Sequence, residues 1–392
     1  MSFLFFLAVI TFIMTMLYTI EVALGLRRLR NLNDIRPFSG PSRPRVSIIV
    51  PACNEEETIE TAMLSLVQQD YGPFEIVVIN DRSTDRTGAI LEKLAAQYPR
   101  IRLLEVTELP PGWLGKNHAL HYGARAAGGD YLLFTDADVL LEKTTVARAM
   151  TIMVAERLDH LSLIFKNIAA GSLLNAMIQD AGAALFFLFK PWAARNPRSR
   201  YFMGVGAFNL VKKDVYRRIG GHESIRMHPI DDIMLGKVIK QHGFRQDCLA
   251  GYDFVTVRWY ETAGMMIDGL MKNVFALYNF RVTWVLAGIV IIFVMTIFPV
   301  WGVFLADGYA RLLFLATVMV RGIAFVRGSV MLGNGIRSFP WSLVTPYINI
   351  FIMIKATVTT LKNKGIDWRG TYYPLAQLRN NMPILQPFAA RK

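Results

Sequence analysis

The chain has 392 residues, enough for one large domain or two, and 53% of them are hydrophobic, which is high for a soluble protein. Its formal net charge is +13, but no basic run is interleaved with aromatic residues, so nucleic-acid binding is disfavoured. We attribute the charge to basic flanks of membrane segments and to attraction for an anionic lipid bilayer.

The first element is an uncharged apolar segment that is long enough to cross a bilayer. It lacks a basic start and a small-residue cleavage site, so a retained anchor over residues 1–24 fits better than a cleavable signal peptide. Arg27, Arg28 and Arg30 follow and place the next part of the chain on the cytoplasmic side. A basic linker is expected over residues 25–44.

Residues 45–270 read as one cytosolic domain of alternating strands and helices. Strands are expected at 46–52, 74–80, 101–106 and 131–136, and helices at 56–69, from about 83 to 98, and at 116–127. This order predicts an α/β fold whose mainly parallel sheet is covered by helices on both faces. Ligands of such sheets bind beyond the carboxyl ends of the strands, which here are the polar stretches PACNE, NDRSTD and TDAD.

Residues 172–192 form an apolar stretch whose only charges are Asp180 and Lys190. Two interpretations remain, a buried core helix and an interfacial helix beside the membrane. The final FFLFKPW favours the interfacial helix.

A C-terminal transmembrane region is expected over residues 283–362, with one strong apolar block followed by two weaker ones that contain charges. The tail, residues 363–392, is basic and indicates a cytosolic C-terminus, whereas four full crossings would place it outside. We therefore expect three spans and one interfacial segment.

Asp136 and Asp138 end the fourth strand, and two carboxylates at this spacing can share one hard divalent cation that neutralises a diphosphate. The dinucleotide fingerprint G-x-G-x-x-G does not follow the first strand, and GWLGKN is too short for a Walker A loop. An ordinary dinucleotide enzyme or P-loop NTPase is therefore disfavoured.

An ordered series of motifs surrounds this pair. They are VSIIVPACNEEETI, EIVVINDRSTDRT, GWLGKNHAL, YLLFTDADV and PIDDIMLGKVIKQHG. In this order they resemble the family 2 glycosyltransferases, nucleotide-sugar enzymes of the GT-A fold, over about residues 45–260. The segment LPPGWLGKNHAL is similar to the membrane-bound subset that includes hopanoid-associated and carotenoid glycosyltransferases.

The resemblance implies that Asp136 and Asp138 bind Mg²⁺ or Mn²⁺, which oxygen-only ligation suits, together with the donor diphosphate. Asn54 and Glu55 lie where the first strand meets its helix and are expected to contact the ribose or base. A helix cap with a favourable first-turn acid is the alternative. Asp81 corresponds to the family aspartate that reads the nucleobase, for which uridine is our expectation.

Lys116 is expected to contact the diphosphate as a point charge, with a solvated surface lysine as the alternative. His118 and His121 are spaced like metal ligands, but no further ligand lies nearby in sequence, so zinc is not expected. Arg258 is a further expected diphosphate ligand. With Trp259 it resembles the end of the Q-x-x-R-W motif of processive polysaccharide synthases, although valine replaces the glutamine.

Asp231 and Asp232 open a helical stretch where the family usually has Glu-Asp, and the resemblance assigns the general base to Asp232. An acidic first helical turn is the alternative. The small-residue stretch 201–210 occupies the position of a loop that lines the acceptor site, where glycines would permit close approach of the substrate.

Together the resemblance implies an inverting, metal-dependent enzyme of the cytoplasmic membrane. Its cytosolic domain would transfer a sugar from a nucleotide-sugar to a membrane lipid acceptor. A processive polysaccharide synthase and a non-catalytic membrane scaffold of the same fold are the alternatives.

Overall fold

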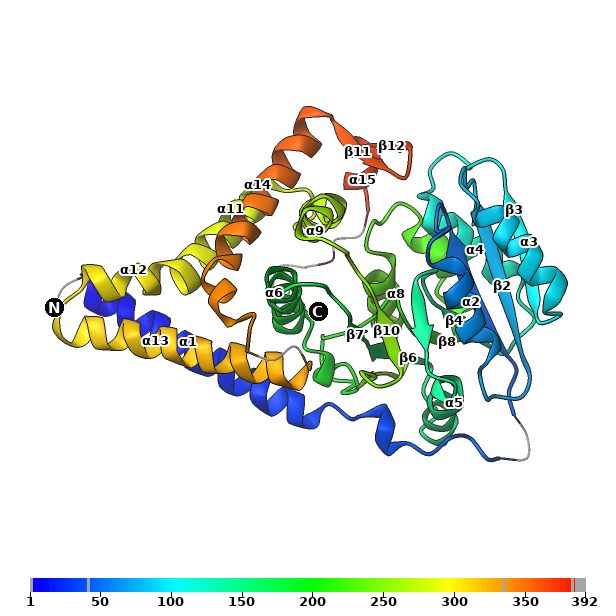
Figure 1. Ribbon diagram of the computed structural model, residues 1–392, viewed down its shortest axis with the longest axis horizontal. Coiled ribbons are helices and arrows are strands. Elements are labelled where there is room, and N and C mark those ends of the chain that lie inside the picture. The colour runs from blue at the N-terminus through cyan, green and yellow to red at the C-terminus, as the bar shows by residue number, and fades with distance from the viewer. Residues whose placement is uncertain (1–2, 41–42, 334–335, 382–383, 385–392) are drawn as a thin grey trace.

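The computed structural model describes residues 3–40, 43–333, 336–381 and 384. Figure 1 shows an α/β domain on one side and a group of long helices on the other. Arg391 and Lys392 of the predicted basic tail lie outside the described residues.

A seven-stranded sheet forms the centre of the α/β domain, in the order β3-β2-β1-β4-β8-β6-β9. Its strands are β1 Val46–Ala52, β2 Phe74–Asp81, β3 Ile101–Val106, β4 Tyr131–Phe134, β6 His160–Ile164, β8 Asn209–Lys212 and β9 Gln246–Ala250. Neighbouring strands are parallel except at β8, which is antiparallel to both β4 and β6. The predicted α/β fold with a mainly parallel sheet is confirmed.

The helices of this domain are α2 Ile59–Val67, α3 Thr87–Gln97, α4 Gly115–Ala126, α5 Thr145–Ala155, α7 Lys213–Arg218 and α8 Asp231–Gln241. The predicted start of α3 in the DRSTDRT turn is a few residues early. The cap residue is Arg86, and Asp85 just before it accepts a hydrogen bond of 2.9 Å at its Oδ1 from the Thr87 backbone N–H.

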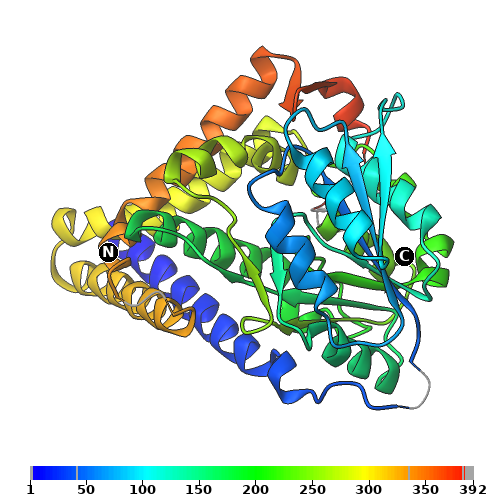
Figure 2. The same cartoon turned by 45° about the vertical axis from the view of Figure 1, so that its right-hand side comes forward.

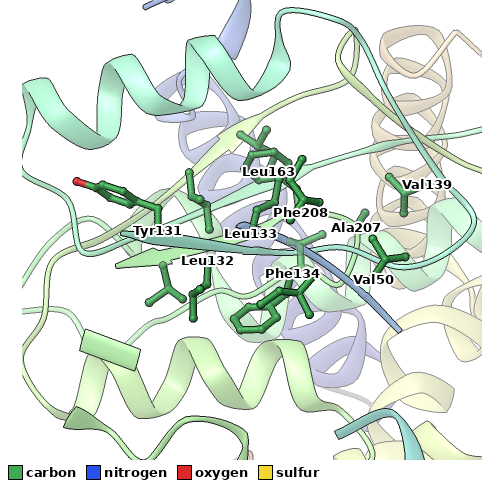
Figure 3. Packing of buried hydrophobic residues seen from close by; sticks show 14 of the residues in the cluster. Val50, Tyr131, Leu132, Leu133, Phe134, Val139, Leu163, Ala207 and Phe208 are labelled. Atoms are coloured by element: carbon green, nitrogen blue, oxygen red, sulfur yellow. The ribbon is translucent and has the colours of Figure 1, made fainter. Parts of the chain in front are cut away.

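The core lies on both faces of the sheet. Leu132 and Leu133 are successive residues of β4 that point to opposite faces, and both are fully buried. Figure 3 shows these side chains with Phe134, Val50 and Phe208 around β4. Burial on both faces explains why the strands read as continuous apolar runs.

A second sheet of three short strands, which the sequence did not predict, lies beside the first. Its order is β5-β10-β7, with β5 Val139–Leu141, β7 Lys166–Asn167 and β10 Val255–Val257. Because β5 begins directly after Asp138, its pairing with β10 fixes the outgoing side of the turn that contains Asp136 and Asp138.

Four stretches of the described chain are long and apolar enough to cross a membrane. They are α1 Phe3–Arg28, α6 Ser172–Phe189 with the turn Pro191–Ala193, α11 Val282–Ile292 continued by Phe293–Ile297 and α12 Phe298–Leu305, and α13 Gly308–Met331. The helix α14 Thr345–Lys362 falls short of that apolarity.

The helix α6 runs across α1. Figure 1 shows α6 nearly end-on, whereas α1 and α13 extend along the plane of the view. Where α6 meets α1, the Tyr18 hydroxyl donates a hydrogen bond of 3.2 Å to the Ala183 carbonyl, and Lys190 pairs with Glu21. Only part of α6 is buried, and Phe187 is 50% exposed, so α6 is not an enclosed core helix.

The predicted linker 25–44 is partly helical and docked on the α/β domain. The helix α1 continues to Arg28, and Leu32 is fully buried in the core. Arg30 donates to the Glu156 carboxylate at 2.5 Å and also to Asp247, so it fixes the end of the anchor to α5 and β9.

Residues 365–379 are folded, which corrects the interpretation of the segment 363–392 as a simple tail. They form β11 Gly365–Trp368, β12 Thr371–Pro374 and α15 Leu375–Arg379. The two strands make a hairpin, and its Ile366 and Tyr373 are buried with Leu114 and Phe275 in a second apolar core. Phe275 belongs to α10 Met271–Leu277, which follows α9 Ala263–Gly269.

Candidate functional site

The carboxyl ends of β1, β2 and β4 form one rim, made of residues 52–55, 80–85 and 135–138, as the strand order predicts. Asn54 takes a left-handed conformation with φ 56°. Its side-chain oxygen accepts a hydrogen bond of 2.8 Å from the Thr84 N–H, and its own N–H donates to the Ser83 hydroxyl at 3.1 Å. The first two polar loops are therefore joined, and Asn54 has a structural role besides any contact with a ligand.

Lys116, at the start of α4, lies among the carboxylates of Asp136, Asp231 and Asp232, which we call the acidic cluster. Its Nζ is 2.7 Å from Asp136 Oδ1 and 3.4 Å from Asp231 Oδ1. Burial alone would lower the pKa of Lys116, but the carboxylates of Asp136, Asp231 and Asp232 outweigh it and raise that pKa above its ordinary value. Lys116 is therefore a fixed cation and not a solvated surface lysine.

Asp232 approaches the same cluster from the first turn of α8. Its Oδ2 accepts a hydrogen bond of 2.8 Å from the Gly206 N–H. A Cβ added at Gly206 would lie 2.7 Å from Asp136 Oδ2 and 3.5 Å from Asp232 Oδ2. The predicted base and the first predicted metal ligand therefore flank one glycine.

The glycines Gly204 and Gly206 of the 201–210 stretch allow close packing against neighbouring parts of the chain. A Cβ at Gly204 would lie 1.8 Å from the carbonyl oxygen of Asp232. The structure thus explains Gly204 and Gly206 by close contact with α8 and with two carboxylates, where the sequence predicted close approach of a substrate.

The cluster has more carboxylates than its cations can balance. Burial, followed by the charges of Asp136 and Glu55, raises the pKa of Asp138 to about 7. Burial, followed by the charge of Asp231, raises the pKa of Asp232 to about 7. A divalent cation would relieve this repulsion, and carboxylate oxygens are the ligands that Mg²⁺ and Mn²⁺ prefer.

The described residues contain no group of three or more histidine, cysteine, aspartate or glutamate side chains that could hold a metal ion by itself. Asp136 and Asp138 would therefore supply only part of a coordination shell, leaving positions for phosphate or water oxygens. His118 and His121 pack around Trp113, with ring centroids at 5.6 and 4.9 Å, and lie in an aromatic contact.

Asp81 is already paired. Its side chain is 5% exposed, and Arg82 donates to both of its oxygens, at 2.8 and 3.1 Å. Arg82 also donates to the Thr371 hydroxyl of the hairpin at 3.2 Å. A nucleobase that is read by Asp81 would have to share or displace Arg82.

Glu55 is also paired, by a residue that sequence analysis missed. Arg369 in the hairpin turn donates to Glu55 Oε1 at 2.5 Å and to the Cys53 carbonyl. The signal was present in the sequence, because Arg369 and Gly370 separate two short runs with aromatic residues. Both take positive φ, at 49° and 75°, as a two-residue hairpin turn requires.

Arg258 is not drawn into the acidic cluster. It follows β10, its side chain is 65% exposed, and its ion-pair partner in the described chain is Glu261 at 3.9 Å. Trp259 stacks on Tyr260 with ring centroids 5.3 Å apart. Of the predicted site residues, Asp136, Lys116 and Asp232 form one cluster, Asp138 follows Asp136 in the same turn, and Arg258 lies outside the cluster.

Comparison with known proteins finds similar sequences among glycosyltransferases. Residues 47–220 match the family described as Glycosyl transferase family 2. The 4,4'-diaponeurosporenoate glycosyltransferase of Staphylococcus haemolyticus (strain JCSC1435) is 28% identical over 257 residues, which cover 60% of this chain and 62% of that protein. The protein of the same name from Staphylococcus aureus (strain MRSA252) is 23% identical over 379 residues, covering 93% and 98%.

One solved structure shares the fold across nearly the whole chain. It is the mannosyltransferase PcManGT from Pyrobaculum calidifontis in complex with GDP-Man and Mn²⁺. The TM-score is 0.56 at 22% sequence identity, and the match covers 92% of this chain and 99% of that one. This likeness confirms the predicted GT-A type of fold.

Proposed function

We propose that this chain, which carries a glycosyltransferase family 2 domain over residues 47–220, transfers one sugar from a nucleotide-sugar to a membrane lipid with inversion at the anomeric carbon. The observation that carries the proposal is the single cluster of Asp136, Lys116 and Asp232 around Gly206. It combines a site for a diphosphate with a base for an acceptor.

The base in this proposal is Asp232. Its carboxylate would take the proton from the acceptor hydroxyl while that oxygen forms a bond to the anomeric carbon and the bond to the diphosphate oxygen breaks. A pKa of about 7 suits the transfer, because the group is partly ionised near neutral pH and still basic enough to accept a proton. The Gly206 N–H fixes the orientation of the carboxylate.

The leaving diphosphate would lie against Lys116 and the Asp136 and Asp138 carboxylates. A divalent cation held by the two aspartates would neutralise part of its charge when bound. Lys116 holds the Asp136 carboxylate in place at 2.7 Å and adds a fixed positive charge. Asn54, Glu55 and Asp81 complete the proposed nucleoside side of the rim.

A lipid acceptor is proposed from the helices and from the relatives. The diaponeurosporenoate glycosyltransferases bear the name of a carotenoid acid, and this supports a long apolar acceptor here. The arginines in the last turn of α1, Arg27 and Arg28, support a cytosolic catalytic domain on the inner side of the cytoplasmic membrane. The orientation of α6 across α1 supports the interpretation of α6 as an interfacial helix between the bilayer and the site.

The test is sugar transfer in membranes that contain the full chain. UDP- and GDP-linked labelled hexoses are supplied separately, with Mn²⁺, with Mg²⁺ or with EDTA, and the lipid extract is analysed by mass. The proposal expects a lipid heavier by one hexose unit that EDTA abolishes. A ladder of products would establish processive synthesis, and no metal-dependent product with either donor class would contradict the proposal.

A further inference from the structure

Lys272 is a cation near the site that the mechanism above does not use. It lies on α10, and its Nζ is 3.7 Å from the centroid of the Trp368 ring in β11. In the part of the chain that the structure describes, no carboxylate lies within ion-pairing distance of this ammonium and no acceptor receives a hydrogen bond from it. Among the described residues, this ammonium contacts the Trp368 ring through a cation–π interaction.

The ammonium of Lys272 lies in the field of the acidic cluster. Its pKa is lowered to about 7, first by desolvation and then by the positive charges of Lys116 and Arg369, while Asp231 and Asp136 oppose this shift. Lys116 lies on α4, Arg369 in the hairpin turn, Asp231 on α8 and Asp136 in the rim. The geometry agrees, because the Trp368 ring that Lys272 contacts is followed directly by Arg369, which pairs with Glu55 of the rim.

Of Lys116 and Lys272, only Lys272 lacks an ion-pair partner among the described residues. Lys116 already has Asp136 and Asp231 as partners, at 2.7 and 3.4 Å. Lys272 is half-buried and has no anionic partner, so an incoming phosphate would give it a charge-assisted hydrogen bond that it lacks.

The hairpin holds Lys272 in this place. Ile366 and Tyr373 are buried against Phe275 of the same α10 helix, and the Tyr373 hydroxyl accepts a hydrogen bond of 3.1 Å from the Gly115 N–H beside Lys116. Figures 1 and 2 both show β11 and β12 beside the end of the sheet that carries the rim. The two lysines are therefore connected through one packed unit.

We infer that Lys272, held against Trp368 of the C-terminal hairpin, is a second diphosphate-binding residue of the donor site. The inference rests on the proposed function and assigns to the juxtamembrane helix α10 a direct contact with the donor. The ligand class is a diphosphate, whatever the nucleobase attached to it.

The test uses inorganic pyrophosphate with Mn²⁺, because this probe has no base or sugar. Its affinity for the purified full chain in lipid nanodiscs is measured by calorimetry. We expect Lys272→Gln to weaken binding about tenfold or more at about pH 6, and Lys272→Arg to stay within about threefold. The matched control is Lys355→Gln. Lys355 is paired with Asp268, at a distance of 2.7 Å, outside the cluster, so this variant should bind pyrophosphate as the wild type does.

The pH dependence of the pyrophosphate affinity distinguishes a direct charge contact from an effect of the substitution on folding. Below about pH 7 the free Lys272 is protonated and ready to bind, whereas at higher pH it must first take up a proton. The wild-type to Lys272→Gln affinity ratio should therefore fall between about pH 6 and about pH 9. A merely structural lysine would give a ratio that does not change with pH.

Equal pyrophosphate affinity of wild type and Lys272→Gln at about pH 6 would overturn the inference and leave the proposed function intact. A wild-type chain that neither binds pyrophosphate with Mn²⁺ nor transfers sugar would overturn both. If Lys272→Gln fails to fold, Lys272→Met keeps the apolar stem against Trp368 and must show the same loss of affinity and of pH dependence.

Discussion

The guanidinium of Arg369 donates a hydrogen bond of 2.5 Å to the carboxylate of Glu55, 314 residues earlier in the chain. Arg369 follows the last long helix, α14, and Glu55 follows the first strand of the sheet, β1. The C-terminal hairpin therefore packs against residues 53–55 of the rim.

This contact predicts that Arg369 anchors the hairpin. Arg369→Gln should speed amide hydrogen exchange in residues 365–374 by about tenfold, because it loses a charge-assisted hydrogen bond to Glu55. Exchange in β1 and β4 should not change. The control is Arg86→Gln, since Arg86 pairs with Glu56 but is 82% exposed. Unchanged hairpin exchange in Arg369→Gln would show that the second apolar core holds the hairpin alone.

Gly204 is predicted to be essential for the packing of α8. Gly204→Ala would place a Cβ 1.8 Å from the Asp232 carbonyl oxygen, so the loop or the helix must shift. We expect a loss of about 1–3 kcal/mol, seen as a lower thermal midpoint of the purified protein. Gly264→Ala is the control, because its nearest neighbour would be the Thr262 hydroxyl at 3.9 Å. Equal midpoints for the two variants would disprove the contact.

Arg30 is predicted to hold the membrane anchor to the α/β domain. Arg30→Ala leaves the Asp247 carboxylate, whose side chain is 6% exposed, without its cationic partner. A loss of about 2 kcal/mol or more is expected in the thermal stability of the protein. Removing the exposed pair of Arg218 and Asp214, which are 68% and 62% exposed, should change stability by less than about 0.5 kcal/mol.

The burial of Asp138 and the carboxylates around it predict a stability that depends on pH when no metal is present. The folded-state pKa of Asp138 is raised to about 7, so folding disfavours its charged form. This cost is complete above about pH 7 and disappears as the pH falls toward about 4, the ordinary aspartate value. Asp138→Asn should therefore raise the thermal midpoint in EDTA at about pH 8, by an amount that shrinks toward about pH 5.

Added Mn²⁺ supplies the control for this prediction. It should stabilise the wild type and leave Asp138→Asn almost unchanged, because a ligand stabilises only the form that binds it. A difference between the two proteins that is the same at every pH would contradict the electrostatic explanation.

Local patterns were sufficient for the first half of the sheet and for its rim. The apolar runs of β1, β2 and β4 carry their own strand signal, and parallel pairing then brings Asn54, Asp81 and Asp136 to one edge. The partners of these side chains could not be predicted in the same way. Arg82 follows Asp81 directly, but whether its guanidinium turns back to that carboxylate depends on the hairpin beside it.

The meeting of Asp232 with Asp136 depends on long-range packing. It requires the antiparallel strand β8, the close contact of Gly204 with α8, and the hydrogen bond from Gly206. The resemblance to a family assigned the role of Asp232, but no periodicity in the sequence specifies this geometry. The hairpin was missed for a related reason, because its strands are four residues each and are stabilised by residues far away in the sequence.

The central claim is that Asp232 is the base of a sugar transfer at this cluster, and Asp232→Asn tests it most directly. The lipid transfer rate and the pyrophosphate affinity of this variant are measured together with those of Asp214→Asn, an exposed aspartate on α7. We predict that Asp232→Asn loses about 100-fold or more in rate and keeps its pyrophosphate affinity within about threefold, while Asp214→Asn matches the wild type. Transfer by Asp232→Asn at the wild-type rate would contradict the account.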